Sequence, residues 1–212
     1  MAPCATSATR RTRPRKRLSA AERRTQTLER VTRLFAERGF SGTTTADLAR
    51  AAGVSEAMLY KLFGSKEGIY QAMVEHKLAH AGWGEFPADP ELAPREFFRG
   101  LALRIFERVE ADPDFVRLLH YSDLQGGRFA ELFHAAMGEA VLESVGAYVA
   151  GQAAGGVLRA DLDPQLAGAS FLCTCWHWAV ARKVFQTPYL TGVADEQVIT
   201  TLVSLFLEGV QA

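Results

Sequence analysis

The sequence has few cysteines, no long apolar run and no net charge. Three cysteines among 212 residues are too few for the disulfide framework of a small secreted protein, and they suit a reducing cytosol. The longest uncharged stretch, residues 164–181, contains polar side chains and starts with a proline. It therefore predicts a buried or interface helix rather than a membrane span. Arg10 and Arg11 could belong to a twin-arginine export signal, but charged residues and no apolar run follow them. We therefore expect no export, no membrane partner and a cytoplasmic protein.

The residue patterns of enzymes are also missing. We find no nucleophile with a neighbouring base and no glycine-rich phosphate loop, so neither an enzyme nor a cofactor is predicted. Cys173, Cys175 and His177 resemble metal ligands. In a helix, however, Cys175 lies on the opposite side from Cys173, which argues against a site with three ligands. We interpret the two cysteines as buried structural thiols and expect no metal ion.

The balanced charge conceals an uneven distribution. Residues 1–77 hold 15 Lys/Arg and 7 Asp/Glu, a net charge of +8, whereas residues 78–212 hold 9 and 17, a net charge of −8. Residues 1–18 carry six of these cations and almost nothing apolar, which predicts a disordered basic arm. A basic N-terminal part beside an acidic remainder indicates a polyanionic partner for the N-terminal part alone.

No alternating strand pattern occurs, and apolar residues recur at helical spacing from Ser19 to the C-terminus. Ser19 with Glu22, and Thr44 with Asp47, have the spacing of capping boxes and predict the starts of two helices. Gly39 is expected to end the first of them. Further helices are predicted over 66–80, 94–111, from 113, from 128, over 163–185 and over 195–210. The fold class is therefore all-α.

Residues 48–66 are the most informative stretch, because they read as a helix, a tight turn and a second short helix. Gly53 allows the positive φ that a turn directly after a helix requires, and Ser55 can cap the second helix. This is the pattern of a helix-turn-helix that binds DNA, although a plain helical hairpin remains an alternative.

The second helix of this motif has two different sides. Leu59 and Phe63 are four residues apart and give it a buried side. Tyr60 and Lys61 then fall toward solvent, where a duplex could bind.

The segment Leu34–Glu67 resembles the TetR family of bacterial transcriptional regulators. The shared motifs are Phe-Ala-Glu-Arg-Gly-Phe, Thr-Thr, Ala-Gly-Val-Ser, Leu-Tyr and Ser-Lys-Glu, all in register. The resemblance covers about residues 20–75, while residues 78–212 are similar to the family only in length and helix order. It implies a dimer that binds an inverted-repeat operator of double-stranded DNA.

The resemblance also implies roles for single residues. Thr44, Tyr60 and Lys66 would hold the DNA backbone. The exposed side of the second helix would face base edges. With its capping residue, that side comprises Ser55, Glu56, Ala57, Met58 and Lys61. Glu56 and Met58 depart from the usual residue types at their positions, so base contacts by these two are open.

The C-terminal part is rich in phenylalanine and tryptophan, which predicts either ordinary core or the walls of a pocket for a small hydrophobic effector. Candidate lining residues are Phe98, Phe129, Phe133 and Met137. His120 and His134 are candidate polar anchors. The last two long helices carry more apolar surface than one core needs, and the resemblance implies that they form a four-helix bundle from two chains. Candidate interface residues are Cys173, Trp176, Val180, Val198, Leu202 and Leu205.

These observations divide the chain into a disordered basic arm (1–18), a three-helix DNA-binding domain (19–66) and a helical ligand-binding and dimerisation domain (67–212). We expect a dimeric repressor that a small hydrophobic ligand releases from its operator. A regulator without ligand control and an activator are the alternatives within this class. A helical enzyme lacks its catalytic groups here, and an architectural DNA-binding protein should be basic throughout, unlike the acidic C-terminal part.

Overall fold

The computed structural model describes residues 19–80 and 89–212, and the regular structure of these ranges is helical. Backbone pairing of the β type is limited there to an isolated bridge between Leu158 and Gln211, so the all-α expectation is confirmed. The basic arm predicted for residues 1–18 lies outside the described residues. The helices of the described ranges are α1 (Ala20–Arg38), α2 (Thr45–Ala52), α3 (Glu56–Phe63), α4 (Lys66–His80), α5 (Pro94–Ala111), α6 (Pro113–Gln125), α7 (Arg128–Phe133), the π-helical turn η1 (His134–Gly138), α8 (Glu139–Ala154), α9 (Pro164–Lys183), α10 (Pro188–Thr191) and α11 (Asp195–Val210).

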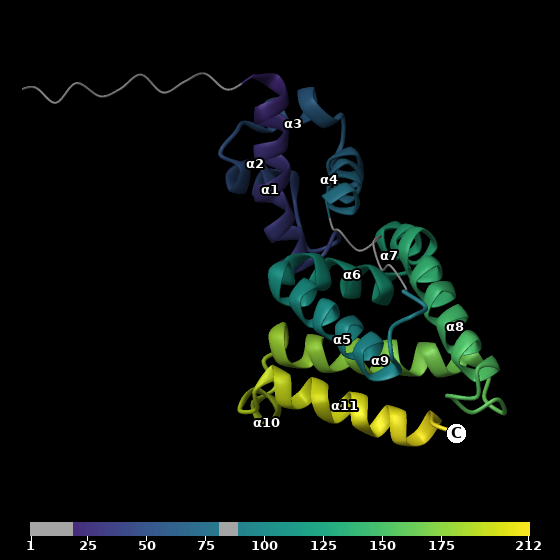
Figure 1. Ribbon diagram of the computed structural model, residues 1–212. Coiled ribbons are helices and arrows are strands. Elements are labelled where there is room, and N and C mark those ends of the chain that lie inside the picture. Colours follow the sequence, from purple (N-terminus) through teal and green to yellow (C-terminus); the bar gives the residue numbers. More distant parts are fainter. Residues whose placement is uncertain (1–18, 81–88) are drawn as a thin grey trace, which may run out of the picture.

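The helices form two groups (Figure 1). Helices α1 to α4 make the upper group, in which α1 contacts both α2 and α4. Helices α5 to α11 make the lower group, in which α9 packs against α5, α8 and α11. The two groups meet where α1 contacts α6. A change in the position of α6 can therefore reach the upper group directly.

The predicted capping residues set the starts of α1 and α2. Ser19 accepts a hydrogen bond from the backbone N–H of Glu22, whose carboxylate accepts one from the N–H of Ser19. Thr44 and Asp47 exchange the same pair of bonds at α2. Both capping boxes are thus confirmed, and each satisfies two N–H groups that the first turn leaves free.

The end of α1 is also as the sequence predicts. Gly39 has φ 68°, and its N–H donates to the carbonyl of Phe35 at 2.8 Å. The chain turns back there, and the ring of Phe40 stacks on that of Phe35 with 6.2 Å between centroids. This contact fixes the direction in which the chain leaves α1.

The long helix expected after Gly127 is present, but a π-helical turn interrupts its α-helical hydrogen bonds. The structure has α7, then η1 with its π-helical hydrogen bonds, and then α8. A π-turn is a local widening of a helix that frequently marks functional sites. Nothing in the local spacing distinguishes it from a continuous helix, because the apolar side carries on through the turn.

Helix α10 is a second feature that the sequence analysis did not predict. The buried guanidinium of Arg182 donates to the carbonyls of Leu190 and Val193, and it pairs with Asp195 at 2.8 Å. The short helix is therefore held by a side chain of α9, a tertiary contact that no local pattern indicates.

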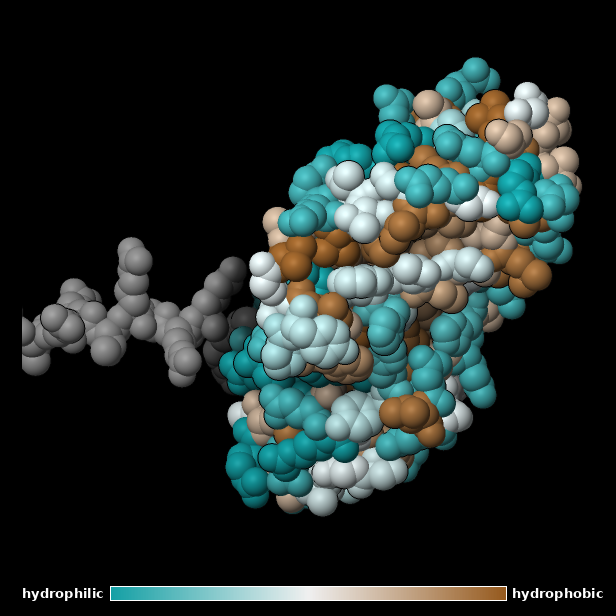
Figure 2. All heavy atoms as spheres, turned by 90° about the horizontal axis from the view of Figure 1, so that it is seen from below, coloured by the Kyte–Doolittle hydropathy of each residue, from teal (hydrophilic) through white to brown (hydrophobic). Residues whose placement is uncertain are grey.

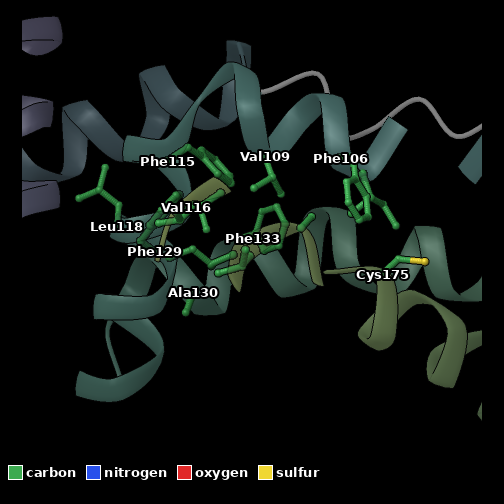
Figure 3. Packing of buried hydrophobic residues seen from close by; sticks show 14 of the residues in the cluster. Phe106, Val109, Phe115, Val116, Leu118, Phe129, Ala130, Phe133 and Cys175 are labelled. Carbon is green, nitrogen blue, oxygen red and sulfur yellow. The ribbon is translucent and has the colours of Figure 1, made fainter. Parts of the chain in front are cut away.

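Aromatic rings fill the middle of the lower group. Phe115, Phe129 and Phe133 point toward one another between α6 and α7, with centroid distances of 5.2 and 5.5 Å from Phe115 (Figure 3). Phe98 packs between Phe171 and Phe206, which joins α5 to α9 and α11. Edge-to-face contacts of this kind stabilise a core beyond its buried area.

Candidate nucleic-acid interface and internal cavity

The turn between α2 and α3 has the geometry that the sequence predicts. Gly53 is in the left-handed region with φ 69° and ψ 34°, and the N–H of Val54 donates to the carbonyl of Ala49 at 3.0 Å. Arg30 of α1 donates to the carbonyl of Ala52 at 2.7 Å, so α1 also holds the C-terminus of α2. The turn is thus fixed from both sides, which sets the angle between α2 and α3.

Helix α3 presents the side that the sequence assigned to DNA. Leu59 is buried, whereas the Tyr60 side chain is 49% exposed and Ala57 and Lys61 are exposed. Ser55 caps the helix by accepting from the N–H of Met58 at 3.2 Å, so its hydroxyl serves the helix itself. Met58 is half-buried, which leaves it less free to reach a base than its neighbours.

Glu56 has a partner that sequence spacing could not reveal. Its carboxylate accepts a hydrogen bond from the hydroxyl of Thr45 at 3.1 Å. Thr45 is the first residue of α2, so the contact joins the N-terminal ends of α2 and α3. The Thr44 hydroxyl next to it donates to Asp47 at 2.6 Å. The two hydroxyls at the start of α2 therefore both donate to carboxylates.

Lys66 begins α4, and its ammonium lies over the ring of Phe40 at 4.2 Å from the centroid. This cation–π contact attaches the start of α4 to the chain after α1. Arg24 lies over Phe63 in the same manner at 4.8 Å. Two cations of this domain thus pack on aromatic rings, and Lys66 remains near the start of a helix where a phosphate can bind.

A cavity of about 320 Å³ lies in the lower group, between α5, α6, α7, η1, α8 and α9. This volume is in the range of small-molecule sites. The residues that line it are Ile105, Leu119, Asp123, Phe133, His134, Gly138, Val141, Leu142, Ala169, Leu172, Cys173 and Trp176.

One of the predicted pocket residues lines the cavity, and two others do not. Phe133 lines the cavity, whereas Phe98 and Phe129 are fully buried in the aromatic core and do not line it. The Met137 side chain lies outside the part of the chain that the structure describes. We therefore keep Phe133 and leave Phe98 and Phe129 out of the candidate pocket, because their rings serve the packing of α5, α6 and α9.

Asp123 and His134 supply a polar pair to the cavity, and His134 was a candidate from the sequence. His134 is hydrogen-bonded through Nε2 to the carboxylate of Asp123 at 2.9 Å. Asp123 had no sequence signal, since an acid near the end of an amphipathic helix is ordinary. His120 does not line the cavity; its ring lies beside Trp176 and Phe185, and burial lowers the pKa of its imidazole.

Some of the residues assigned to a dimer interface are buried within the chain, and others are exposed. Val180, Val198 and Leu202 are buried within the chain itself, so they serve the packing of α9 and α11. Trp176 and Cys173 line the cavity, and Cys173 is also exposed. Leu205 is 63% exposed on α11 and remains available to a second chain.

The cysteines of α9 differ in their surroundings. Cys175 is buried, and burial raises the pKa of its thiol to about 12, whereas Cys173 is exposed. The expectation that both are buried is thus wrong for Cys173. Across the described ranges, no three His, Cys, Asp or Glu side chains are grouped so that they could hold a metal ion. Within the same ranges, no helix has the length and apolar character to cross a membrane.

Comparison with known proteins places these features in a family. The sequence profile of the bacterial regulatory proteins of the tetR family matches residues 28–73. The transcriptional repressor NicS of Pseudomonas putida is 28% identical over 192 residues, which cover 87% of this chain and 90% of NicS.

Solved structures resemble most of the chain. The regulator PfmR of Thermus thermophilus is 28% identical with a TM-score of 0.64, over 86% of this chain and 97% of PfmR. The regulator AibR, solved with isovaleryl coenzyme A and operator DNA, has a TM-score of 0.67 at 22% identity, over 87% of this chain and 97% of AibR. Residues 28–73 match the bacterial regulatory proteins of the tetR family, and the relatives that share most of the chain's length are transcriptional regulators, so the chain is a DNA-binding transcriptional regulator.

Proposed function

We propose that the chain represses transcription as a homodimer on an inverted-repeat operator and leaves the DNA when a small molecule fills the internal cavity. The relative NicS, which shares most of its length with this chain, is named a repressor. AibR supports the general scheme, since it was solved with both a small molecule and operator DNA. The observation that carries the proposal is the continuous set of contacts between the cavity and α4.

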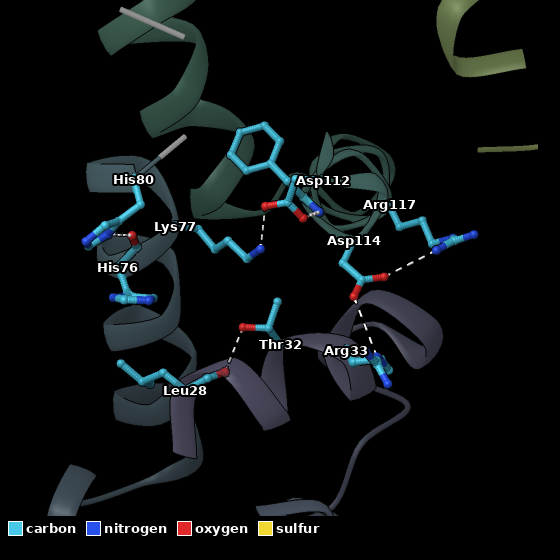
Figure 4. Close-up of polar contacts among 10 residues, drawn as sticks. Leu28, Thr32, Arg33, His76, Lys77, His80, Asp112, Asp114 and Arg117 are labelled. Atoms are coloured by element: carbon cyan, nitrogen blue, oxygen red, sulfur yellow. Dashed lines mark hydrogen bonds and ion pairs between the residues drawn. The ribbon is translucent and has the colours of Figure 1, made fainter. Parts of the chain in front are cut away.

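The contacts begin at the cavity wall. Phe133 lines the cavity, and its ring meets Phe115 of α6 at 5.5 Å between centroids. The N–H of Phe115 donates to the carboxylate of Asp112 at 3.0 Å, which caps the start of α6. The second oxygen of Asp112 accepts from Lys77 of α4 at 2.5 Å (Figure 4). A displacement of Phe133 can therefore move α4, the helix that directly follows α3. Helix α3 is the proposed recognition helix.

Two more contacts join α6 to α1. Asp114 pairs with Arg33 of α1 at 3.9 Å and with Arg117 at 3.2 Å (Figure 4). The hydroxyl of Tyr121 donates to the carbonyl of Glu37 at 3.2 Å. Because α6 contacts both α1 and α4, a ligand that prefers a shifted α6 would change the spacing of the two recognition helices in a dimer. By linkage, such a ligand must weaken DNA binding.

The proposed dimer uses the outer sides of α9 and α11. No charged residue lies between residues 164 and 181, and Leu166 on the outer side of α9 is 68% exposed. The hydroxyls of Ser170 and Thr174 donate to carbonyls of their own helix at 2.7 Å, so a partner can cover them at little cost. Seen from the side of α9 and α11, apolar and weakly polar residues spread across much of the surface (Figure 2).

A release assay tests the proposal. An operator duplex bound by the chain is titrated with a panel of small hydrophobic compounds, and the bound fraction is measured by fluorescence anisotropy. Ala169 lines the cavity, so Ala169→Leu should fill part of it and abolish release while DNA binding persists. The exposed Ala150 of α8 provides the matched control, Ala150→Leu, which should respond as the parent does. Release that is equal in both variants would place the effector outside this cavity.

A further inference from the structure

The cavity is apolar in its depth and polar at its rim. Ile105 and Leu119 are 3% and 2% exposed and form its inner wall. The side chains of Asp123 and His134 are 39% and 57% exposed, so the pair lies where the cavity meets solvent. A molecule in this cavity would thus keep an apolar body inside and a polar group at the rim.

The fixed charge at the rim is negative. Among the described residues that line the cavity, Asp123 is the only acid and none is Lys or Arg. Nε2 of His134 lies 2.9 Å from the Oδ1 atom of Asp123, so this contact involves one of the two carboxylate oxygens. The second oxygen and the remaining lone pairs of a carboxylate can accept further hydrogen bonds.

Aromatic rings lie in the same wall. Phe133 and the half-buried Trp176 both line the cavity. The faces of such rings attract cations, and tryptophan does so most strongly. A carboxylate together with two aromatic rings is a combination that favours a positively charged ligand.

We propose, resting on the ligand-release function above, that the effector is a small organic cation: an apolar or aromatic body with one protonated amine that Asp123 binds at the cavity rim. An anionic effector would meet the carboxylate of Asp123, and the described lining residues include no Lys or Arg to offset it. A neutral apolar effector would cover the carboxylate and leave it with His134 alone as its partner. The chemistry thus separates this cavity from one built for an acyl coenzyme A, whose phosphates are anionic.

Three probes of the same shape and different charge test this. The purified full chain is titrated by calorimetry with naphthylethylammonium, naphthylethanol and naphthylacetate. The ammonium compound should bind at least about tenfold more tightly than the other two, as a charge-assisted hydrogen bond would give. Tighter or equal binding of the alcohol or the acetate would overturn the cationic assignment while leaving a ligand cavity in place.

Two variants assign the effect to one carboxylate. Asp123→Asn should reduce binding of the ammonium probe about tenfold and leave the alcohol nearly unchanged, which also shows that the cavity is intact. Glu131 of α7 is exposed and does not line the cavity, so Glu131→Gln is the matched control and should change neither. An ammonium affinity that Asp123→Asn does not lower would overturn the inference.

The same samples separate this inference from the proposed function. If none of the three probes binds at millimolar concentration, the cationic assignment fails. DNA binding measured in parallel then decides whether the chain still acts as a regulator on an inverted repeat. If a probe binds but leaves the DNA affinity unchanged, the cavity is a binding site and the release function fails instead.

Discussion

We expect Glu56 to lower the affinity of α3 for DNA in general and to raise its selectivity for particular bases. Its carboxylate lies at the start of the recognition helix, where phosphate would be repelled, and Thr45 holds it there by a hydrogen bond of 3.1 Å. A carboxylate fixed in this way can accept from the amino group of a cytosine, which is the hydrogen bond that the major groove offers to an acid. The residue would then penalise every sequence that lacks this partner.

Glu56→Gln tests this role. Removing the negative charge should raise affinity for random DNA, by up to about tenfold at low salt, because phosphate contacts dominate non-specific binding. Affinity for the operator should rise less or fall, so the ratio of the two affinities decreases. Anisotropy titrations on an operator duplex and a scrambled duplex measure the ratio. Equal changes on both duplexes would show that Glu56 does not read a base.

His120 should make folding stability depend on pH. Burial lowers the pKa of its imidazole, and the nearby charge of Asp123 only partly offsets this. The unfolded chain therefore takes up the proton more readily, so the contribution of His120 is present above about pH 6.5, the unfolded pKa, and is lost as the pH falls below it.

His120→Phe should keep an aromatic ring beside Trp176 and lose this titration. Free energies of unfolding in urea at about pH 7.5 and about pH 5.5 should differ less in the variant than in the parent. His76 shifts in the same direction, so part of the dependence should persist. A pH dependence as large as that of the parent would contradict the assignment to His120.

At the scale of the helix, α6 is the element on which the proposed switch depends. Asp112 has two tasks there, since one oxygen caps α6 at the Phe115 N–H and the other pairs with Lys77 of α4. Asn at this position can still cap but carries no charge, whereas Ala can do neither. The two variants therefore separate the start of α6 from its attachment to α4.

Asp112→Ala should destabilise the fold by about 1 kcal/mol more than Asp112→Asn, which is the usual worth of an N-cap. Chemical denaturation of both variants measures the difference. Asp112→Asn should keep its operator affinity yet respond less to a ligand that releases the parent. Equal stabilities of the two variants would mean that the cap is not what Asp112 provides.

Helix starts and ends were predictable because their causes are local. Ser19, Thr44 and Gly53 each act on N–H or carbonyl groups within a few residues, so spacing alone was enough. The turn η1 and helix α10 were not predictable, because the first resembles a continuous helix in sequence and the second is held by Arg182 from another helix.

The cavity shows the same limit. Its wall combines residues from six elements, and whether Phe133 or Phe129 faces it depends on how α7 is rotated against α6. Aromatic content therefore indicated a pocket in this part of the chain, and the identity of its lining came from the tertiary structure.

For the whole molecule, the proposed dimer can be tested on an exposed residue. Leu205→Asp places a charge on a side chain that is 63% exposed, so the fold of one chain should be retained while the dimer is lost. Leu124 of α6 is 86% exposed and outside α9 and α11, which makes Leu124→Asp the matched control. Sedimentation velocity at micromolar concentration should give a monomer for the first and a dimer for the second. A dimeric Leu205→Asp would move the interface away from this part of α11.

The proposed function depends above all on sequence-specific binding of the dimer through α2 and α3. The most direct measurement is an anisotropy titration of the full chain on an inverted repeat from the DNA upstream of its own gene, with a scrambled duplex as competitor. Two chains should bind per repeat, and Tyr60→Ala/Lys66→Ala should weaken binding on both duplexes, while Lys61→Ala should act more on the repeat. Equal affinity for the repeat and the scrambled duplex would show that binding is not sequence-specific. A double variant that binds as tightly as the parent would show that Tyr60 and Lys66 do not contact the DNA.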